Sequence, residues 1–338
     1  MKYQNFTFCD KTSLEIILNT FGHRRLPTLF VIDFEGENNI VLPLNQAKSH
    51  GIFVDVNFDN FQYKNYQNGD FEPFPPKHSF EKFPISKAEY QVGFDKIMTA
   101  LQYGDSFLTN YTCQTPIKTN LSLRQIFEKA QAPFKVLWDN QFTSFSPEIF
   151  VNIIDSKIQT HPMKGTILAD IPNAKNLILN NLKEKAEHAT IVDLMRNDLS
   201  KIARQVKVKR FRYISEIETN QGNIYQVSSE IEGELDANYQ LELGKIIGKL
   251  LPAGSICGAP KPKTLEIIEQ AEGYKRGFYT GVFGIFDGKN VYSAVMIRFI
   301  EKIGDDLVFK SGGGITAQSK LDNEYQEMID KVYLPFGN

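Results

Sequence analysis

The pattern of apolar and polar residues in this chain changes its period several times. Near the start, apolar and β-branched residues gather in short runs bounded by turn-forming residues, a pattern typical of strands. It predicts strands over 26–34, 39–44 and 51–58. A second strand-like region extends from about residue 105 to 170. We therefore expect β-structure in much of the first half of the chain.

Three prolines between residues 71 and 80 interrupt this pattern. Because proline fixes φ and lacks a backbone N–H, neither a helix nor a central strand is expected to pass through the segment. It is the best linker candidate in the chain. We predict that residues 1–85 form a strand-rich N-terminal part of the same globular unit, and that residues 86–338 form its main domain.

Helical periodicity begins after this linker. Ser86 and Glu89 have the spacing of a capping box, and apolar residues follow at helical intervals as far as Gly104. The same reasoning predicts one long helix over 174–203 and further helices that begin near Pro262 and Asp322.

The last part of the chain has the pattern of a β-hairpin. Alternating stretches over 279–286 and 290–300 flank an Asp-Gly turn. A short strand near residue 307 is expected to lead through a glycine loop at 312–314 into the last helix. Strands thus occur in antiparallel-looking groups interrupted by helices, which predicts an α+β fold rather than a doubly wound parallel sheet.

Size and composition limit the possible functions. The chain has 338 residues, of which 42% are hydrophobic, so it can bury a large core. A formal net charge of −2 offers little attraction for nucleic acid or an anionic membrane surface, and neither partner is expected. The first residues lack the apolar run of a signal peptide, so we expect a cytoplasmic protein. The three cysteines have neither zinc-site nor disulfide spacing.

Two pairs of glutamates, each three residues apart, lie on the predicted helices: Glu184 with Glu187, and Glu324 with Glu327. Residues at that spacing share a helix face, and an isolated pair is ordinarily a solvated surface feature. Four carboxylates brought together would repel one another, and a hard divalent cation would relieve the repulsion. Oxygen ligands favour Mg²⁺, which keeps positions for water or substrate. An anionic substrate is therefore expected.

Glycines cluster with small and hydroxyl residues in 252–263 and 310–319. Such segments let backbone N–H groups approach an anion, although tight turns at strand ends have the same composition. Arg298 lies in a predicted strand among apolar neighbours and needs a buried partner there. A substrate carboxylate in a bidentate contact and a carboxylate of the protein itself are both candidates for that partner.

The chain contains eight sequence blocks that, taken in order, resemble a known family. They are SFSPEIF, HPMKGT, EHATIVDLMRNDL, NIYQVSSEIEGEL, LLPAGSICGAPKPKTLEII, RGFYTGVFGIFDG, AVMIRF and SGGGITAQSKLDNEYQEMIDK, and they cover most of residues 144–331. Together they resemble the chorismate-utilising enzymes, which include anthranilate, aminodeoxychorismate, isochorismate and salicylate synthases. The resemblance implies two packed antiparallel β-sheets flanked by helices, essentially one large domain, with 86–338 as the chorismate-binding catalytic domain.

The resemblance also implies roles for individual residues. Glu187 and Glu327 match the direct magnesium ligands of the family, and Glu184 and Glu324 match glutamates that support the ion. Arg298 matches the arginine that grips a carboxylate of chorismate. The other pocket positions that the resemblance implies are Tyr279, Gly313, Gly314, Thr166 and Ser255.

The reaction within the family is indicated mainly by Lys164 of HPMKGT, because anthranilate synthases resemble PIAGT there and aminodeoxychorismate synthases resemble PIKGT. In the related synthases this lysine is thought to attack carbon 2 of chorismate as the hydroxyl on carbon 4 leaves, and ammonia then displaces it. Burial beside a bound cation is expected to lower its pKa. Glu148 matches the acid that protonates the leaving hydroxyl. Gln226 replaces a family histidine; since glutamine is no acid, we expect it to orient substrate.

The sequence therefore predicts a magnesium-dependent aminodeoxychorismate synthase component I, which converts chorismate and ammonia to 4-amino-4-deoxychorismate in p-aminobenzoate and folate biosynthesis. No cysteine lies in a nucleophile elbow, so ammonia is expected from a separate glutamine amidotransferase subunit. Two alternatives stay open. One is an anthranilate, isochorismate or salicylate synthase, and the other is an inactive module that binds a glutaminase.

Overall fold

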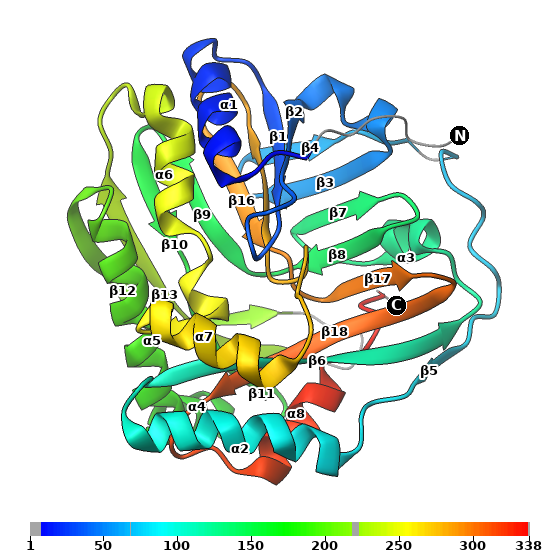
Figure 1. Ribbon diagram of the computed structural model, residues 1–338, viewed down its shortest axis with the longest axis vertical. Coiled ribbons are helices and arrows are strands. Elements are labelled where there is room, and N and C mark those ends of the chain that lie inside the picture. The colour runs from blue at the N-terminus through cyan, green and yellow to red at the C-terminus, as the bar shows by residue number, and fades with distance from the viewer. Residues whose placement is uncertain (1–7, 68, 218–222, 337–338) are drawn as a thin grey trace.

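The computed structural model describes residues 8–67, 69–217 and 223–336. Within these residues the chain forms two antiparallel sheets of nine strands each, with helices packed on their outer faces (Figure 1). The prediction of an α+β fold with two packed antiparallel sheets is confirmed.

The first sheet follows one path of eight strands. In spatial order these are β11 (Met163–Leu168), β13 (Ile224–Glu234), β10 (Lys157–Thr160), β9 (Ile149–Ile154), β16 (Val291–Val295), β15 (Val282–Phe286), β1 (Thr28–Ile32) and β2 (Ile40–Pro43). The ninth strand, β12 (Arg204–Ile217), pairs with β13 off this path.

The second sheet has the same plan. Its path is β14 (Gly258–Ala259), β6 (Leu108–Thr119), β18 (Asp306–Ile315), β17 (Phe299–Ile303), β8 (Phe142–Ser146), β7 (Phe134–Trp138), β3 (Ile52–Phe58) and β4 (Phe61–Lys64). The short β5 (Phe80–Lys82) pairs with β6. The three predicted N-terminal strands are thus present as β1, β2 and β3, two in the first sheet and one in the second.

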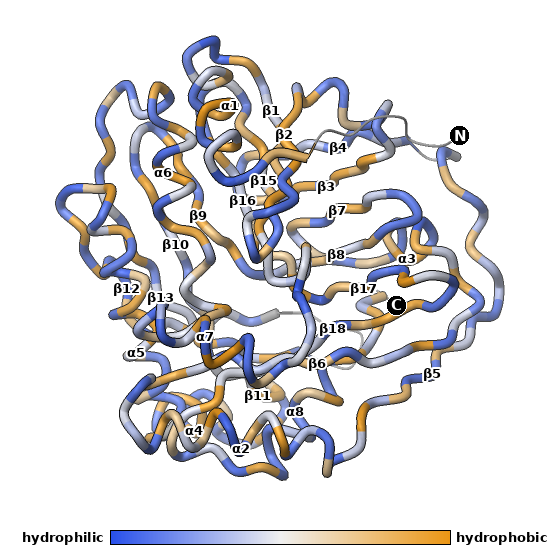
Figure 2. Tube along the Cα trace, viewed as in Figure 1, coloured by the Kyte–Doolittle hydropathy of each residue, from blue (hydrophilic) through white to orange (hydrophobic). Residues whose placement is uncertain are grey.

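A buried apolar cluster joins the two sheets. Val31 and Phe283 enter it from the first sheet, and Val54, Val136 and Phe299 enter it from the second. All five side chains are at most 1% exposed. Removing apolar surface from water stabilises a fold by about 25 cal/mol per Å², so this cluster holds the sheets face to face. Figure 2 shows the hydrophobic residues gathered along interior strands such as β9.

Helices cover the outer faces much as their capping residues predict. Ser86 and Glu89 form the expected capping box, in which Ser86 N donates to Glu89 Oε2 at 2.8 Å. The helix that follows, α2 (Lys87–Tyr103), ends at Gly104 in the left-handed region. The two predicted C-terminal helices are α7 (Lys261–Glu272) and α8 (Leu321–Asp330).

Three helices were not predicted. These are α1 (Lys11–His23), α3 (Leu123–Lys129) and α6 (Leu243–Leu250). Leu14, Leu18 and Gly22 of α1 are buried at i, i+4 spacing, which is the signal that could have revealed it. α1 packs closely on α6, where Gly244 faces the backbone of Glu15, and Gly22 of α1 faces the carbonyl oxygen of Gln240, just before α6.

The predicted helix over 174–203 is two helices. α4 (Ala174–Asn180) and α5 (Leu182–Ser200) are separated at Asn181, whose backbone is extended. The Asn181 side chain accepts the N–H of Glu184 at 3.1 Å and so caps α5. Arg212 donates to the carbonyls of Ile178 and Leu179 at the end of α4. These contacts from a distant strand satisfy carbonyl groups that have no partner within the helix where α4 ends. The periodicity of the sequence could not indicate them.

The predicted strand over 290–300 is also interrupted. β16 ends at Val295 in the first sheet and β17 begins at Phe299 in the second, so this segment crosses from one sheet to the other. Arg298 lies at the crossing with φ +51°, in the left-handed region. It is half-buried rather than buried within a strand.

The glycine loop expected at 312–314 is part of a strand. Gly312, Gly313 and Gly314 lie in β18 and pair with Thr112, Tyr111 and Asn110 of β6. A Cβ on Gly312 would lie 2.1 Å from the carbonyl oxygen of Tyr111. The glycines therefore permit a close approach of two backbones rather than a turn.

The contact between α1 and α6 gives a stability test. In Gly244→Ala the new Cβ would lie 2.2 Å from the backbone oxygen of Glu15, so α1 must move, and we expect a loss of about 1–3 kcal/mol in the free energy of unfolding in urea. Gly248→Ala on the same helix meets no atom closer than 4.0 Å and should instead gain about 0.5–1 kcal/mol. Equal effects from both variants would contradict this packing argument.

Candidate active site

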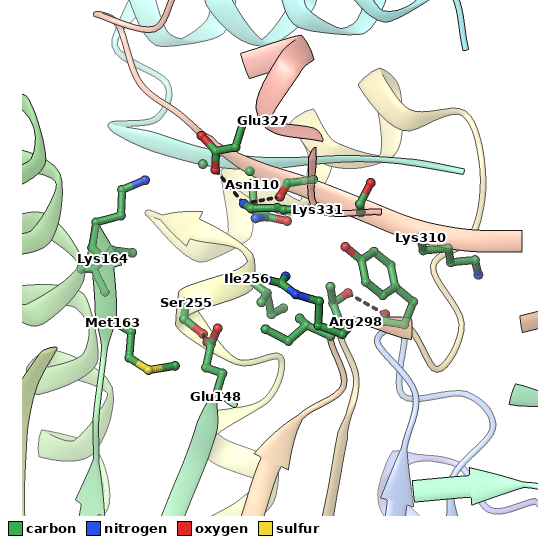
Figure 3. A pocket seen from close by; sticks show the side chains of 18 of the residues that line it. Asn110, Glu148, Met163, Lys164, Ser255, Ile256, Arg298, Lys310, Glu327 and Lys331 are labelled. Carbon is green, nitrogen blue, oxygen red and sulfur yellow. Dashed lines mark hydrogen bonds and ion pairs between the residues drawn. The ribbon is translucent and has the colours of Figure 1, made fainter. Parts of the chain in front are cut away.

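A pocket opens where the two sheets meet, and it contains most of the residues that the sequence singled out (Figure 3). Its walls come from β11, α5, β18, α8 and the turn before β14. The predicted site residues that line it are Glu148, Lys164, Glu187, Ser255, Tyr279, Arg298, Gly313, Gly314 and Glu327. Residues from both sheets, spread from 148 to 327 along the sequence, are thus brought together.

Lys164 faces this pocket because β11 contains a bulge. The register against β13 shifts between Met163, opposite Ser228, and Thr166, opposite Gln226, so β11 carries one extra residue there. A bulge re-aims the side chains beside it. Gly165, with φ +89°, supplies the required backbone conformation. Thr166 is exposed and does not line the pocket, contrary to the role that the resemblance implied.

Two lysine–glutamate pairs line the pocket. Lys164 Nζ lies 2.8 Å from Glu187 Oε2, and Lys331 Nζ lies 2.6 Å from Glu327 Oε1. Lys331 also donates to the carbonyl of Gly312 at 2.7 Å. Lys331 was not singled out from the sequence, although its i+4 position after Glu327 on a helix is a signal for such a pair. These lysines reduce the carboxylate repulsion that the sequence argument assigned to a cation alone.

The two lysines differ in their electrostatic balance. Burial lowers the pKa of Lys164, but the charge and hydrogen bond of Glu187 outweigh burial and raise that pKa above its ordinary value. The lowered pKa that the sequence hypothesis expected was for Lys164 beside a bound cation, and it stays a prediction. For Lys331 burial dominates and lowers the pKa despite Glu327.

Glu148 is placed to act as an acid. Its carboxylate accepts a short hydrogen bond from the hydroxyl of Ser255, and the two groups lie side by side in Figure 3. Burial raises the pKa of Glu148, against the opposing effects of Ser255, Lys331 and Arg298. A carboxyl group with a raised pKa stays protonated closer to neutral pH and can donate a proton there.

Arg298 projects into the pocket from the crossing between the sheets (Figure 3). Its Nε donates to the hydroxyl of Tyr333 at 3.2 Å. Within the described ranges it forms no ion pair with a protein carboxylate, so the internal salt bridge that the sequence left open is not observed. Its terminal N–H groups are placed to hold a carboxylate of a ligand.

Besides Thr166, three of the predicted residues lie outside the pocket. Glu184 lines a neighbouring hollow behind β11. Glu324 is buried at 4% exposure and accepts the hydroxyl of Ser319 at 2.7 Å. Gln226 contacts the sulfur of Met163, itself a pocket residue, and Ser228 Oγ at 3.4 Å. Gln226 thus supports the pocket wall from behind.

The carboxylates can be tested as a magnesium site. Glu187 and Glu327 both line the pocket and offer the hard oxygen donors that Mg²⁺ prefers. Among the residues that the structure describes, no group of three or more His, Cys, Asp or Glu side chains forms a metal cluster. The donor set therefore fits an ion that takes two carboxylates and completes its shell with water and substrate, but not a cage made of protein ligands alone.

A buried ion pair holds the wall of the pocket. The side chains of Arg276 and Glu272 are each 1% exposed and contact through Arg276 Nε and Glu272 Oε2 at 2.8 Å. Arg276 also donates to the carbonyls of Ile256 and Asn110, both pocket residues, at 2.9 Å each. Lys310, a fifth residue at this wall, donates to the carbonyl of Arg276 at 2.9 Å. The pair thus ties β6, β18 and the Ser255 turn together.

Comparison with known proteins identifies the family. A model for chorismate binding enzymes matches residues 42–336 of this chain. The chain belongs to the chorismate-binding enzyme family. An uncharacterised PabA-like protein of Pasteurella multocida is 51% identical over 321 residues, which are 94% of this chain and 97% of that protein.

Relatives with assigned reactions are more distant from this chorismate-binding protein. Aminodeoxychorismate synthase component 1 of Bacillus subtilis is 30% identical, over 74% of this chain and 55% of its own length. Anthranilate synthase component 1 of Haloarcula marismortui is 32% identical, over 76% of this chain and 55% of its own length. The solved structure of MenF, the menaquinone-specific isochorismate synthase of Escherichia coli, superposes with a TM-score of 0.72. The match covers 96% of this chain and 81% of the MenF chain at 14% identity, and it shows a shared fold. Overall identity therefore does not separate the reactions of the family.

The Glu148–Ser255 contact predicts a measurable shift. Ser255→Ala removes a donor that favours the charged carboxylate, so the pKa of Glu148 should rise further above its ordinary value. Carbon-13 NMR of glutamate-labelled protein, assigned with Glu148→Gln, would follow the titration. Ser146→Ala is the matched control, because that hydroxyl accepts the backbone N–H of Glu148 at 3.0 Å and does not touch its carboxylate. An equal shift in both variants, or none in Ser255→Ala, would contradict the assignment.

Proposed function

We propose that this chorismate-binding enzyme is an aminodeoxychorismate synthase component I of the cytoplasm, which converts chorismate and ammonia to 4-amino-4-deoxychorismate for p-aminobenzoate synthesis. The observation that supports this most is the presence of Lys164 and Glu148 in one pocket that also contains Arg298. A nucleophile, an acid and a carboxylate-binding group are the parts that this substitution requires.

The residues divide the reaction between them. The Lys164 amine bonds to carbon 2 of chorismate, the ring double bonds shift, and the bond from carbon 4 to its hydroxyl breaks. Glu148 gives its proton to that hydroxyl, which leaves as water. Ammonia then bonds to carbon 4, the double bonds shift back, and the bond from carbon 2 to Lys164 breaks. Lys164 leaves as the neutral amine with which it began, and one proton of the new ammonium group on carbon 4 passes to the Glu148 carboxylate, so both residues are restored.

Charge around the pocket suits this substrate. Arg298 and Lys331 line it with Lys164, while Lys310 of the wall is already paired with Glu301 at 2.6 Å, and chorismate is a dicarboxylate. Glu187 and Glu327 would hold magnesium, with Glu184 and Glu324 in support. When bound, the ion would supply positive charge to a substrate carboxylate and to Glu187. The negative charge of Glu187 would then be divided between the ion and Lys164, with which Glu187 otherwise pairs alone.

The nitrogen has to be supplied as ammonia. Cys113 and Cys257 are buried, and burial raises the pKa of each thiol to about 12, while burial also raises the pKa of Cys9. A thiol must ionise to attack glutamine, so none of the three is suited to that reaction. A separate glutamine amidotransferase subunit is therefore part of the proposal.

The first test is an assay of products. With chorismate, Mg²⁺ and ammonium, we expect a 4-amino product that retains the enolpyruvyl group, identified by mass spectrometry, and we expect chelation with EDTA to abolish its formation. Direct release of pyruvate with anthranilate or salicylate would identify a different reaction of the family. Turnover of chorismate at the same rate without ammonium would likewise identify a different reaction of the family.

The second test addresses the nucleophile. Lys164→Ala should lower the amination rate by about two orders of magnitude or more, because the variant lacks the amine proposed to form the intermediate. Lys164→Arg keeps a positive charge beside Glu187 but cannot attack carbon 2, and it should be equally impaired. Calorimetry should show that both variants still bind chorismate. Recovery of activity by Lys164→Arg would show that the residue acts only through its charge.

A further inference from the structure

Arg298 is held by a tyrosine that lies 35 residues later in the chain. The Nε group of Arg298 donates to the hydroxyl of Tyr333 at 3.2 Å. The ring of Tyr333 also lies close, with its centroid 5.4 Å from Arg298 Cζ, which is within the range of a cation–π contact. One residue thus contacts the guanidinium through both a hydroxyl and a ring. Tyr333 was not singled out from the sequence.

The segment that carries Tyr333, residues 331–336 after α8, is fixed on both sides of the tyrosine. Val332 is 1% exposed and packs in a buried apolar cluster. Phe336 forms an antiparallel β-bridge with Ala130 at the end of α3. Tyr333 itself is 41% exposed, so its own burial contributes little to holding the segment. A change at its hydroxyl therefore leaves both anchors in place.

A guanidinium can hold a carboxylate along either of two edges. The side-on edge uses Nε with one terminal nitrogen, and the end-on edge uses both terminal nitrogens. Because Nε of Arg298 already donates to Tyr333, the side-on edge is engaged. Among the described residues, none accepts a hydrogen bond from Nη1 or Nη2 of Arg298, and Arg298 lines the pocket. The end-on edge is thus the one open to a ligand.

We infer that Tyr333 is a positioning residue for substrate binding, which holds Nε of Arg298 so that the two terminal nitrogens are presented to a carboxylate of chorismate. The inference rests on the proposed function for the role of Arg298, and it adds the residue that orients this arginine. A long side chain loses rotamer freedom when a ligand fixes it, and orienting it in advance lowers that cost. Tyr333 does not touch the reacting atoms in this account.

The test removes a single hydroxyl. Tyr333→Phe keeps the ring but loses the acceptor of Nε, so we expect the dissociation constant of chorismate to rise about threefold to tenfold. The constant is measured by NMR titration with Mg²⁺ and without ammonium, so that amination cannot proceed. Arg298→Met has no N–H for the tyrosine to hold. Adding Tyr333→Phe to it should therefore change its weaker binding by less than twofold.

Tyr325→Phe is the matched control. This residue lies on α8, just before the segment, and its hydroxyl donates to the carbonyl of Ile85 at 2.8 Å. The variant loses a tyrosine hydroxyl from the same part of the chain but no contact with Arg298. Its dissociation constant for chorismate should stay within twofold of that of the unmodified protein.

Each outcome decides a different point. Unchanged binding in Tyr333→Phe would overturn the inference. So would an equal loss in Tyr325→Phe, or an equal loss when Tyr333→Phe is added to Arg298→Met, because the substitution would then act through the fold and not through the arginine. If the unmodified protein binds chorismate but forms another product, the proposed function fails, while the same binding constants still decide what Tyr333 does. Absence of chorismate binding would refute both.

Discussion

The buried ion pair between Arg276 and Glu272 is the interaction on which the pocket depends. Removing two charges from water is costly, and such a pair persists only when its remaining hydrogen-bonding capacity is satisfied. Here Arg276 also donates hydrogen bonds to the carbonyls of Ile256 and Asn110 and to the hydroxyl of Thr280. Glu272 accepts hydrogen bonds from the backbone N–H and the hydroxyl of Thr112. Because these partners belong to both sides of the pocket wall, the pair fixes the strands that carry the chemistry.

Charged side chains line the pocket whose wall this ion pair holds in place. Lys164 and Lys331 each pair with a glutamate, so the cleft contains both signs of charge close together. Positive groups attract an anionic substrate, while the paired glutamates offer oxygen ligands to a hard cation. Glu148 stands apart from these pairs, and burial rather than a neighbouring charge sets its pKa. Distinct environments thus suit chemically similar carboxylates to the different roles proposed for them.

Two local irregularities of the backbone decide which side chains reach the pocket. The bulge at Gly165 separates Lys164 from Thr166, which a regular strand would place on the same face. The crossing between sheets at Arg298 releases that side chain from a strand and directs it to the cleft. Lys164 and Arg298 were selected from their sequence context, and both line the pocket. Of the two hydroxyl residues proposed for the pocket, Ser255 lines it and Thr166 does not. Register shifts depend on partner strands, so a single sequence does not reveal them.

Local chemistry within the sequence determined the α+β class, the capping box at Ser86 and the spacing of the glutamate pairs, because each depends on residues a few positions apart. Resemblance of sequence blocks to the family singled out Lys164 and Glu148, which both line the pocket. Tertiary structure alone decided the rest. It broke the helix at Asn181, where Arg212 supplies contacts from a distant strand. It also placed the triple glycine inside a sheet and brought Lys331 to the pocket. These outcomes depend on groups far apart in the sequence, whose contacts exist only once the sheets have packed.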